Sequence, residues 1–120
     1  MIKCGVDIVR INRLEEINPA IRARFIQRVY TSLEQTQLGN SPEALAGVFA
    51  AKEAVSKALG TGIGKVHWQH IEIIHAQTGE PEVRLHAQAL LTAQSKNLNE
   101  WAVSISHDGG YAIAMAVAQT

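Results

Sequence analysis

One long helix dominates the sequence and limits the folds that the chain can adopt. Ser41 and Pro42 form a typical helix start, with serine as the N-cap and proline at the first helical position. Gly60 stands where a C-cap glycine belongs, so we predict a helix from Pro42 to about Leu59. Its buried stripe recurs at intervals of three and four residues. The stripe comprises Leu45, Val48, Phe49, Lys52, Val55 and Leu59.

Alternating segments at both ends of the chain predict strands. In residues 1–9 one face carries Ile2, Cys4, Val6 and Ile8, which predicts a half-buried strand with Asp7 on the other face. Residues 101–106 and 111–117 alternate in the same way, and residues 107–110 join them as a hairpin. In the last strand small residues share one face and allow a helix or another sheet to approach closely. They are Ala112, Ala114 and Ala116.

The remaining segments predict shorter elements. Residues 12–30 read as a helix interrupted at Asn18-Pro19, in which Ile21 and Phe25 pack inward together. Residues 31–34 match a capping box that opens a short helix, which ends at Gly39-Asn40. Two short strands at 71–74 and 82–85 flank a turn at 78–81, and residues 87–97 form a small helix. The prediction is an α+β fold in a single domain, residues 1–120, with strands and helices segregated.

Composition restricts the class of protein. Hydrophobic residues make up 47% and charged residues 18% of the 120, which is typical of a folded globular chain. Cys4 is the only cysteine, so it forms no internal disulfide, and we interpret it as a small core residue in a reduced, cytoplasmic protein. We expect no signal peptide and no membrane span. With only six aromatic residues, we also expect no basic aromatic surface on which nucleic-acid bases could stack.

The formal net charge is zero but unevenly spread. Residues 1–30 carry a net charge of +3 and residues 31–120 a net charge of −3. A basic segment on a neutral chain indicates an acidic partner near the N-terminus, and the alternative is a solvated helix face.

The segment with the most chemical information spans residues 50–64. Glu53 and Lys57 are four residues apart and project from one side of the long helix, beside its apolar stripe. From spacing alone they could be an exposed ion pair. Three glycines follow within five residues, and such a loop either ends the helix in a flexible turn or lets backbone N–H groups bind phosphates.

These motifs together resemble the holo-acyl-carrier-protein synthases, the short trimeric 4′-phosphopantetheinyl transferases. The segment "FAAKEAVSKALGTGIG" at 49–64 looks like the family's signature. Five further segments fall in the family's order. They are "GVDIVRINRLEE" at 5–16, "RFIQRVYTSLE" at 24–34, "WQHIEI" at 68–73, "TGEPEV" at 78–83 and "VSISHDGGYAIAMAV" at 103–117.

The resemblance implies a fold, a reaction and a metal site. The fold would be an antiparallel sheet packed on the long helix. The reaction would move 4′-phosphopantetheine from coenzyme A to a serine of an apo-acyl-carrier protein in fatty acid biosynthesis, releasing 3′,5′-ADP. Asp7 and Glu53 match the family's Mg²⁺ ligands, and Lys57 matches a lysine near the phosphates. The base that accepts the serine proton is left open between Glu53 and a water on the metal.

The resemblance also implies where coenzyme A and the carrier bind. The cofactor would lie against Lys57, against the loop and against His107, for which the alternative is an ordinary turn residue. The loop comprises Gly60, Thr61, Gly62, Ile63 and Gly64. An acidic carrier would dock on a basic first helix. Arg13 matches that docking position best, and the other candidates are Arg10, Arg22, Arg24 and Arg28. We expect a homotrimer with each active site between two subunits.

The sequence departs from the family's pattern at two positions, and it also allows other interpretations of its function. Val48 stands where the family has a basic residue, and His70 where an aspartate is frequent. The first departure favours an alternative function, a non-catalytic carrier-binding subunit that retains the fold. The cluster of His67, His70 and His75 could suggest zinc, but its spacing does not force one face. No pattern places a Ser-His-Asp triad.

Overall fold

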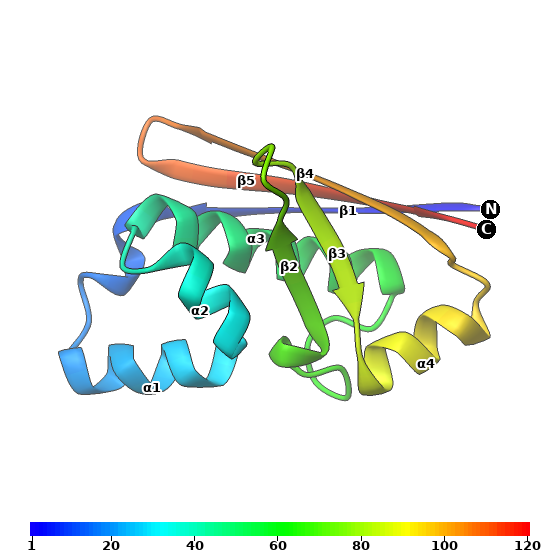
Figure 1. Ribbon diagram of the computed structural model, residues 1–120, viewed down its shortest axis with the longest axis horizontal. Coiled ribbons are helices and arrows are strands. Elements are labelled where there is room, and N and C mark those ends of the chain that lie inside the picture. The colour runs from blue at the N-terminus through cyan, green and yellow to red at the C-terminus, as the bar shows by residue number, and fades with distance from the viewer.

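Helix α3 (Pro42–Leu59) lies at the centre of the computed structural model, which describes residues 1–120 (Figure 1). A three-stranded antiparallel sheet of order β1-β5-β4 covers one side of α3. Its strands are β1 (Ile2–Arg10), β4 (Glu100–Asp108) and β5 (Tyr111–Gln119). Shorter elements cover the other side. They are α1 (Pro19–Val29), α2 (Ser32–Leu38), the antiparallel hairpin of β2 (Ile71–His75) and β3 (Pro81–Leu85), and α4 (Ala87–Ser95). Two single-turn 3₁₀ helices are η1 (Ile11–Leu14) and η2 (Trp68–His70).

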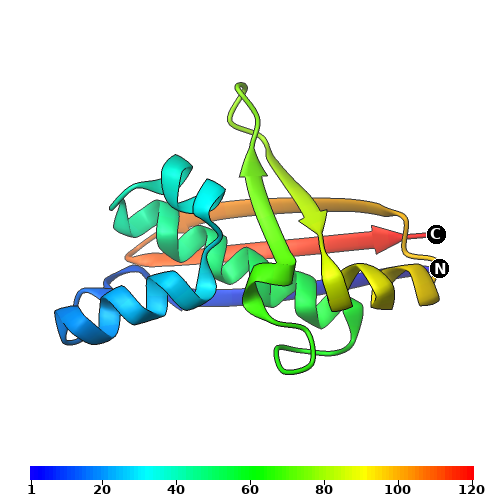
Figure 2. The same cartoon turned by 60° about the horizontal axis from the view of Figure 1, so that its bottom comes forward.

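The position of α3 between two layers explains its composition. Thirteen of its 18 residues are buried, because the sheet and the shorter elements enclose it on opposite sides (Figure 2). A helix that is apolar almost all round is stable only in such surroundings. The α+β prediction is confirmed. None of the helices combines the length and apolar composition that a membrane crossing requires.

The predicted helix boundaries are confirmed by their caps. The Ser41 hydroxyl accepts a hydrogen bond from the N–H of Ala44, and Gly60 ends α3 with a left-handed φ of +83°. At α2 the capping box is complete, since Thr31 and Glu34 exchange side-chain and backbone hydrogen bonds. At α1 the side chain of Asn18 caps the N-terminus.

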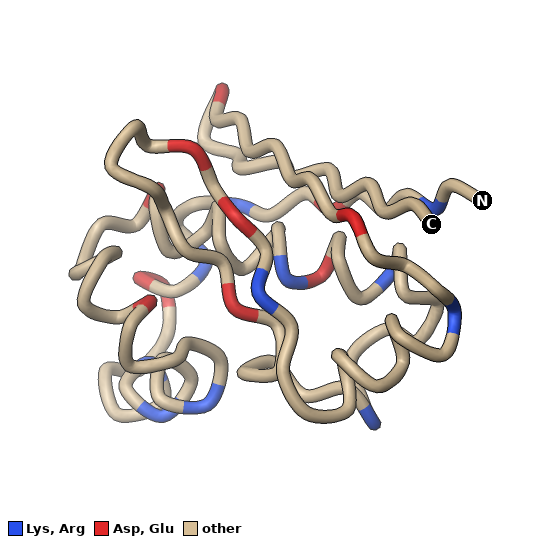
Figure 3. The backbone as a smooth tube through the Cα atoms, turned by 45° about the vertical axis from the view of Figure 1, so that its right-hand side comes forward, with Lys and Arg blue, Asp and Glu red and all other residues tan.

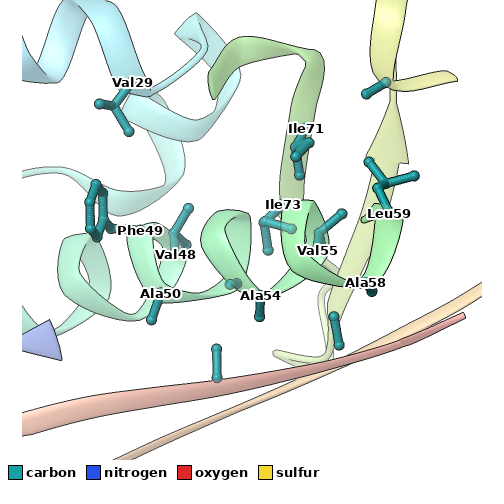
Figure 4. Packing of buried hydrophobic residues seen from close by; sticks show 14 of the residues in the cluster. Val29, Val48, Phe49, Ala50, Ala54, Val55, Ala58, Leu59, Ile71 and Ile73 are labelled. Carbon is teal, nitrogen blue, oxygen red and sulfur yellow. The ribbon is translucent and has the colours of Figure 1, made fainter. Parts of the chain in front are cut away.

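Small residues let α3 approach the sheet closely. Ala50, Ala54 and Ala58 lie on the side of α3 that faces the strands (Figure 4). The opposing alanines of β5 are also fully buried. They are Ala112, Ala114, Ala116 and Ala118. The predicted small-residue face of β5 is therefore confirmed, and it packs on α3.

The tightest point of this contact is Gly5 on β1. A Cβ atom built there would lie 2.1 Å from the carbonyl oxygen of Ala54 and 2.9 Å from the Cβ of Lys57. Only glycine fits, because both α3 atoms belong to a helix that is enclosed on its far side. This crossing sets the distance between β1 and the functional face of α3.

Our interpretation of the buried face of β1 was wrong. The strand buries Gly5 and Val9 against α3, while Ile2, Val6 and Ile8 are between 50% and 70% exposed. Cys4 lies on the same outer face and is exposed, so it is not a core residue. The physical reason is that α3 selects the face with the smaller side chains, since a larger residue in place of Gly5 would prevent close packing.

The inward packing of Ile21 with Phe25 is only partly correct. Phe25 is half-buried and its ring packs 5.5 Å from that of Phe49, but Ile21 is 52% exposed. Helix α1 covers the core with a narrow stripe, and Ile21 lies outside that stripe.

A buried ion pair joins α3 to the elements on its other side. Lys52 and Glu34 are both fully buried, with Nζ and Oε1 2.7 Å apart. Lys52 also donates hydrogen bonds to the carbonyls of Ile71 and Trp68. Burial lowers the pKa of Lys52, and the adjacent carboxylate of Glu34 opposes this effect. Lys52, which occupies a position in the apolar stripe of α3, therefore links this helix to α2, η2 and β2 inside the core.

Side chains of α2 complete the outer edge of strand β2. Glu34 accepts a hydrogen bond from the N–H of Ile73. Two residues further along, the amide of Gln37 both accepts from the N–H and donates to the carbonyl of His75. The backbone groups of this edge therefore have partners without a third strand.

We predict that Gly5→Ala destabilises the protein severely, by about 3 kcal/mol, because the new methyl group would overlap the backbone of α3. Urea unfolding followed by circular dichroism measures the change. Gly64→Ala is the matched control, since a Cβ there meets nothing within 4 Å and the φ of Gly64 is not positive. Equal stability of the two variants would contradict the packing argument.

Candidate active site

Asp7, Glu53 and Lys57 come together where β1 crosses α3. The Nζ of Lys57 lies 3.3 Å from Oδ1 of Asp7 and donates a hydrogen bond to the carbonyl of Val6 at 3.0 Å. The Asp7 side chain is 20% exposed and that of Lys57 50% exposed, so the pair borders solvent. The sequence placed these residues 46 and 50 positions apart, and the fold makes them neighbours.

The charges around Glu53 oppose one another. Partial burial raises the pKa of Glu53, and the negative charge of Asp7 raises it further, while Lys57 and Arg13 lower it. Asp7 and Glu53 are therefore close enough to repel. Two repelling carboxylates at a solvent-exposed edge fit a Mg²⁺ ion, which takes one or two carboxylates and completes its shell with water and substrate phosphates. No group of three or more His, Cys, Asp or Glu side chains forms a metal site.

In the glycine loop after α3 (residues 60–64), most backbone N–H groups already donate hydrogen bonds within the same part of the chain. The N–H groups of Gly60, Thr61 and Gly62 all donate to the carbonyl of Ser56, and that of Gly64 donates to the carbonyl of Val66. The N–H of Ile63 has no backbone acceptor. The loop is thus closed onto the end of α3, and its role in binding coenzyme A stays a prediction.

His107 lies at the opposite end of α3. Its Nε2 donates a hydrogen bond to the carbonyl of Glu43 at 2.8 Å, in the first turn of the helix. Gly60 ends the same helix 17 residues later, which corresponds to about 25 Å. The two parts of the predicted cofactor site therefore do not meet within one chain.

The five candidate docking arginines differ in their surroundings. Arg10 pairs with Glu16 at 3.1 Å. Arg13 lies over the ring of Phe49, 5.9 Å from its centroid, and its charge reaches Glu53. The other three lie on α1, where basic residues gather (Figure 3). They are Arg22, which is half-exposed, and Arg24 and Arg28, which are exposed.

Sequence reasoning missed two contacts of charged residues near the site. It assigned Arg13 to docking only, although the charge of its guanidinium also acts on Glu53, which with Asp7 forms the acidic pair of the site. It did not assign Lys96, whose Nζ donates to the carbonyl of Leu59 at the end of α3 and lies 3.0 Å from where a Cβ of Gly60 would be. No local pattern signals Lys96, because its partner is 37 positions away.

The three clustered histidines do not converge on one point. His67 and His70 stack with ring centroids 4.9 Å apart, but His75 does not join them in a group of three ligands.

A comparison with protein families gives a full-length match. Residues 3–116 match the model of the 4′-phosphopantetheinyl transferase superfamily. The holo-[acyl-carrier-protein] synthase of Alkaliphilus metalliredigens is 46% identical, over 98% of this chain and 99% of the relative. The enzyme of the same name from Natranaerobius thermophilus is 41% identical, over 98% of this chain and 96% of the relative.

Solved structures of the same family have the same fold. The holo-[acyl-carrier-protein] synthase of Helicobacter pylori, in complex with coenzyme A, matches with a TM-score of 0.86 and 34% identity, over 97% of this chain and 99% of the other. The enzyme from Neisseria meningitidis gives a TM-score of 0.86 and 34% identity over the whole of both chains.

We predict that Glu53→Gln raises the melting temperature in the absence of divalent cations at pH 8, by about 2 °C. The substitution removes one of two repelling charges. Because the pKa of Glu53 is raised, its ionised form costs stability above that pKa, and the cost disappears as the pH falls below the usual value of 4.5. The advantage of the variant should therefore shrink between pH 8 and pH 4.

Differential scanning calorimetry across this range measures the difference. Glu82→Gln is the control, an exposed carboxylate on β3. A Glu53→Gln variant that is less stable than the wild type at pH 8 would show that the attractions to Lys57 and Arg13 outweigh the repulsion.

Proposed function

This chain belongs to the 4′-phosphopantetheinyl transferase superfamily, as one of its holo-[acyl-carrier-protein] synthases, and we propose that it transfers 4′-phosphopantetheine from coenzyme A to a serine of an apo-acyl-carrier protein. The observation that carries the proposal is the meeting of Asp7, Glu53 and Lys57 at the crossing of β1 and α3. These are two carboxylates and one cation, the groups that a pyrophosphate and its Mg²⁺ ion need.

In the proposed reaction the serine oxygen attacks the β-phosphorus of coenzyme A. A new bond forms between this oxygen and phosphorus, and the bond from phosphorus to the oxygen of 3′,5′-ADP breaks. The serine proton leaves to the carboxylate of Glu53 or to water. Lys57 is the cation closest to Asp7, and it would balance the charge of the phosphates.

Asp7 and Glu53 would hold the Mg²⁺ ion. When bound, the ion neutralises charge on the pyrophosphate and orients the β-phosphate. Partial burial and repulsion from Asp7 raise the pKa of Glu53. A divalent cation held by the two carboxylates would relieve this repulsion, which supports the assignment.

Coenzyme A would bind between two subunits of a homotrimer. The glycine loop and His107 lie at opposite ends of α3, so they can contact one cofactor only if they come from different copies. A large apolar surface is available for association. It comprises Ile2, Val6, Ile8, Tyr111, Ile113 and Met115, all 42–70% exposed on the outer face of β1 and β5.

The acidic carrier would dock on the basic helix α1 and on Arg13. Arg24 and Arg28 are exposed there without an acidic partner in the chain, whereas Arg10 is paired. Arg13 lies between α1 and the acidic pair, where it would direct an acidic helix towards the reacting atoms.

The alternative function, a non-catalytic carrier-binding subunit, was based on Val48. Its side chain is 1% exposed, in the core cluster that also includes Leu45 and Val29. Valine at this position therefore serves packing, while all three charged residues of the site are retained. We keep the enzyme as the proposal.

We predict that the protein adds the mass of one phosphopantetheine to an apo-acyl-carrier protein in the presence of coenzyme A and Mg²⁺, as measured by intact mass spectrometry. A chelator should stop the reaction and added Mg²⁺ restore it. Asp7→Ala and Glu53→Ala should each lower kcat on the order of 10²–10³-fold, since each removes a charge that acts on the transition state.

Glu82→Ala is the matched control and should keep wild-type activity, because its carboxylate is exposed on β3. The acidic pair would not be the reaction centre if Glu53→Ala were as active as this control. Carrier binding without any transfer by the wild type would favour the non-catalytic alternative.

We further predict that two inactive variants restore each other when they are co-expressed. Glu53→Ala and His107→Ala damage opposite walls of a shared site, so a mixed trimer contains some intact sites. In a ring with equal random mixing, about a quarter of the sites receive both intact residues, and activity should reach that fraction of the wild type. Failure to exceed the activity of either variant alone would place each site within one chain.

A further inference from the structure

A polar groove lies between the end of α1, the glycine loop and η2, with a volume of about 570 Å³. Its only charged residue is Arg28, in the last turn of α1. Two imidazoles, His67 and His70, provide further positive charge when they are protonated. The other lining residues are Ile63, Gly64, Trp68 and Gln69, so no carboxylate faces the groove.

The groove is held open by fixed contacts. The amide of Gln69 donates to the carbonyls of Gln27 and Tyr30, which joins η2 to the end of α1. The N–H of His67 donates to Nδ1 of His70 at 3.2 Å, and the two rings stack at 4.9 Å. The ring of His70 is thus held by the backbone N–H of His67, and the exposed ring of His67 stacks against it.

The surroundings of His70 disfavour its protonated form. Burial lowers the pKa of His70, and repulsion from His67 and His86 lowers it further. Arg28 adds positive charge from α1. His86 in turn donates a hydrogen bond to the carboxylate of Glu72 at 3.2 Å, and Arg84 also acts on that carboxylate.

We propose that this groove is a second contact for the acidic carrier protein, and that docking there is coupled to proton uptake by the His67–His70 pair. The inference rests on the proposed function. Charge complementarity and position support it, because Arg28 is common to the groove and to the basic face of α1 that also carries Arg24. A carrier that spans α1 therefore reaches the histidines with its next acidic residues.

The coupling follows from linkage. A carboxylate placed over the stacked rings stabilises their protonated form, so binding takes up a proton, and affinity rises as the pH falls from 8 to 6. The carboxylates of the carrier stay ionised in this range, because their ordinary pKa values are about 4. One coupled proton changes the affinity by at most about tenfold per pH unit, and we expect a three- to tenfold gain over the range.

Isothermal titration calorimetry of the full-length protein with an apo-acyl-carrier protein tests the inference at pH 6, 7 and 8. Measurement in two buffers with different ionisation enthalpies counts the protons taken up. The wild type should take up a proton near pH 7. The double variant His67→Gln, His70→Gln should lose both the uptake and the pH dependence.

Glutamine keeps an acceptor for the N–H of His67, so the double variant should fold, and circular dichroism checks this. His75→Gln is the matched control, a histidine on β2 outside the groove, and should keep the wild-type pH profile. Arg28→Met should weaken binding at every pH, because it removes the arginine that lines the groove. Unchanged proton uptake in the double variant would overturn the inference.

Two further outcomes are distinguishable. If titration with coenzyme A instead of the carrier shows the histidine-dependent proton uptake, the groove binds a phosphate and the carrier assignment is wrong. If the carrier binds with the expected proton uptake but no phosphopantetheine is transferred, the proposed function fails while the docking inference stands.

Discussion

The crossing of β1 over α3 is the contact on which the candidate site depends. Gly5 lets the two backbones approach until a single methyl group would meet the carbonyl of Ala54 at 2.1 Å. Asp7 lies two residues further along the same face of the strand, and Glu53 and Lys57 lie on the neighbouring turns of α3. A wider separation would leave the two carboxylates as independent surface charges. Close packing therefore brings three residues that are distant in the sequence near enough for their charges to act on one another.

The other side of α3 is fixed by the Lys52–Glu34 pair. Loss of one partner from such a pair typically costs 3–5 kcal/mol, because a buried charge is left alone. Lys52 precedes Glu53, so the pair fixes the rotation of the helix at the residue next to the acidic pair. An apolar side chain could fill the same space but would not define that rotation through the three polar contacts that Lys52 makes with Glu34, Trp68 and Ile71. Stability and the position of the site therefore depend on the same turn.

Local rules predicted the helix ends well, since Ser41, Thr31 and Gly60 act through neighbours within four residues. They could not predict which face of β1 is buried, because both faces carry residues that a core accepts. That choice depends on how closely α3 packs. The resemblance brought Asp7, Glu53 and Lys57 into one site, and the structure places them together. The resemblance also grouped His107 with the glycine loop. Only the length of α3 reveals that the two lie too far apart in one chain to form a single site.

The side chains that complete β2 limit how copies of the chain can associate. Glu34 and Gln37 occupy the hydrogen-bonding positions at Ile73 and His75, where a strand from another molecule would otherwise pair. Growth of this hairpin into a continuous intermolecular ribbon is blocked at that edge, even at high protein concentration.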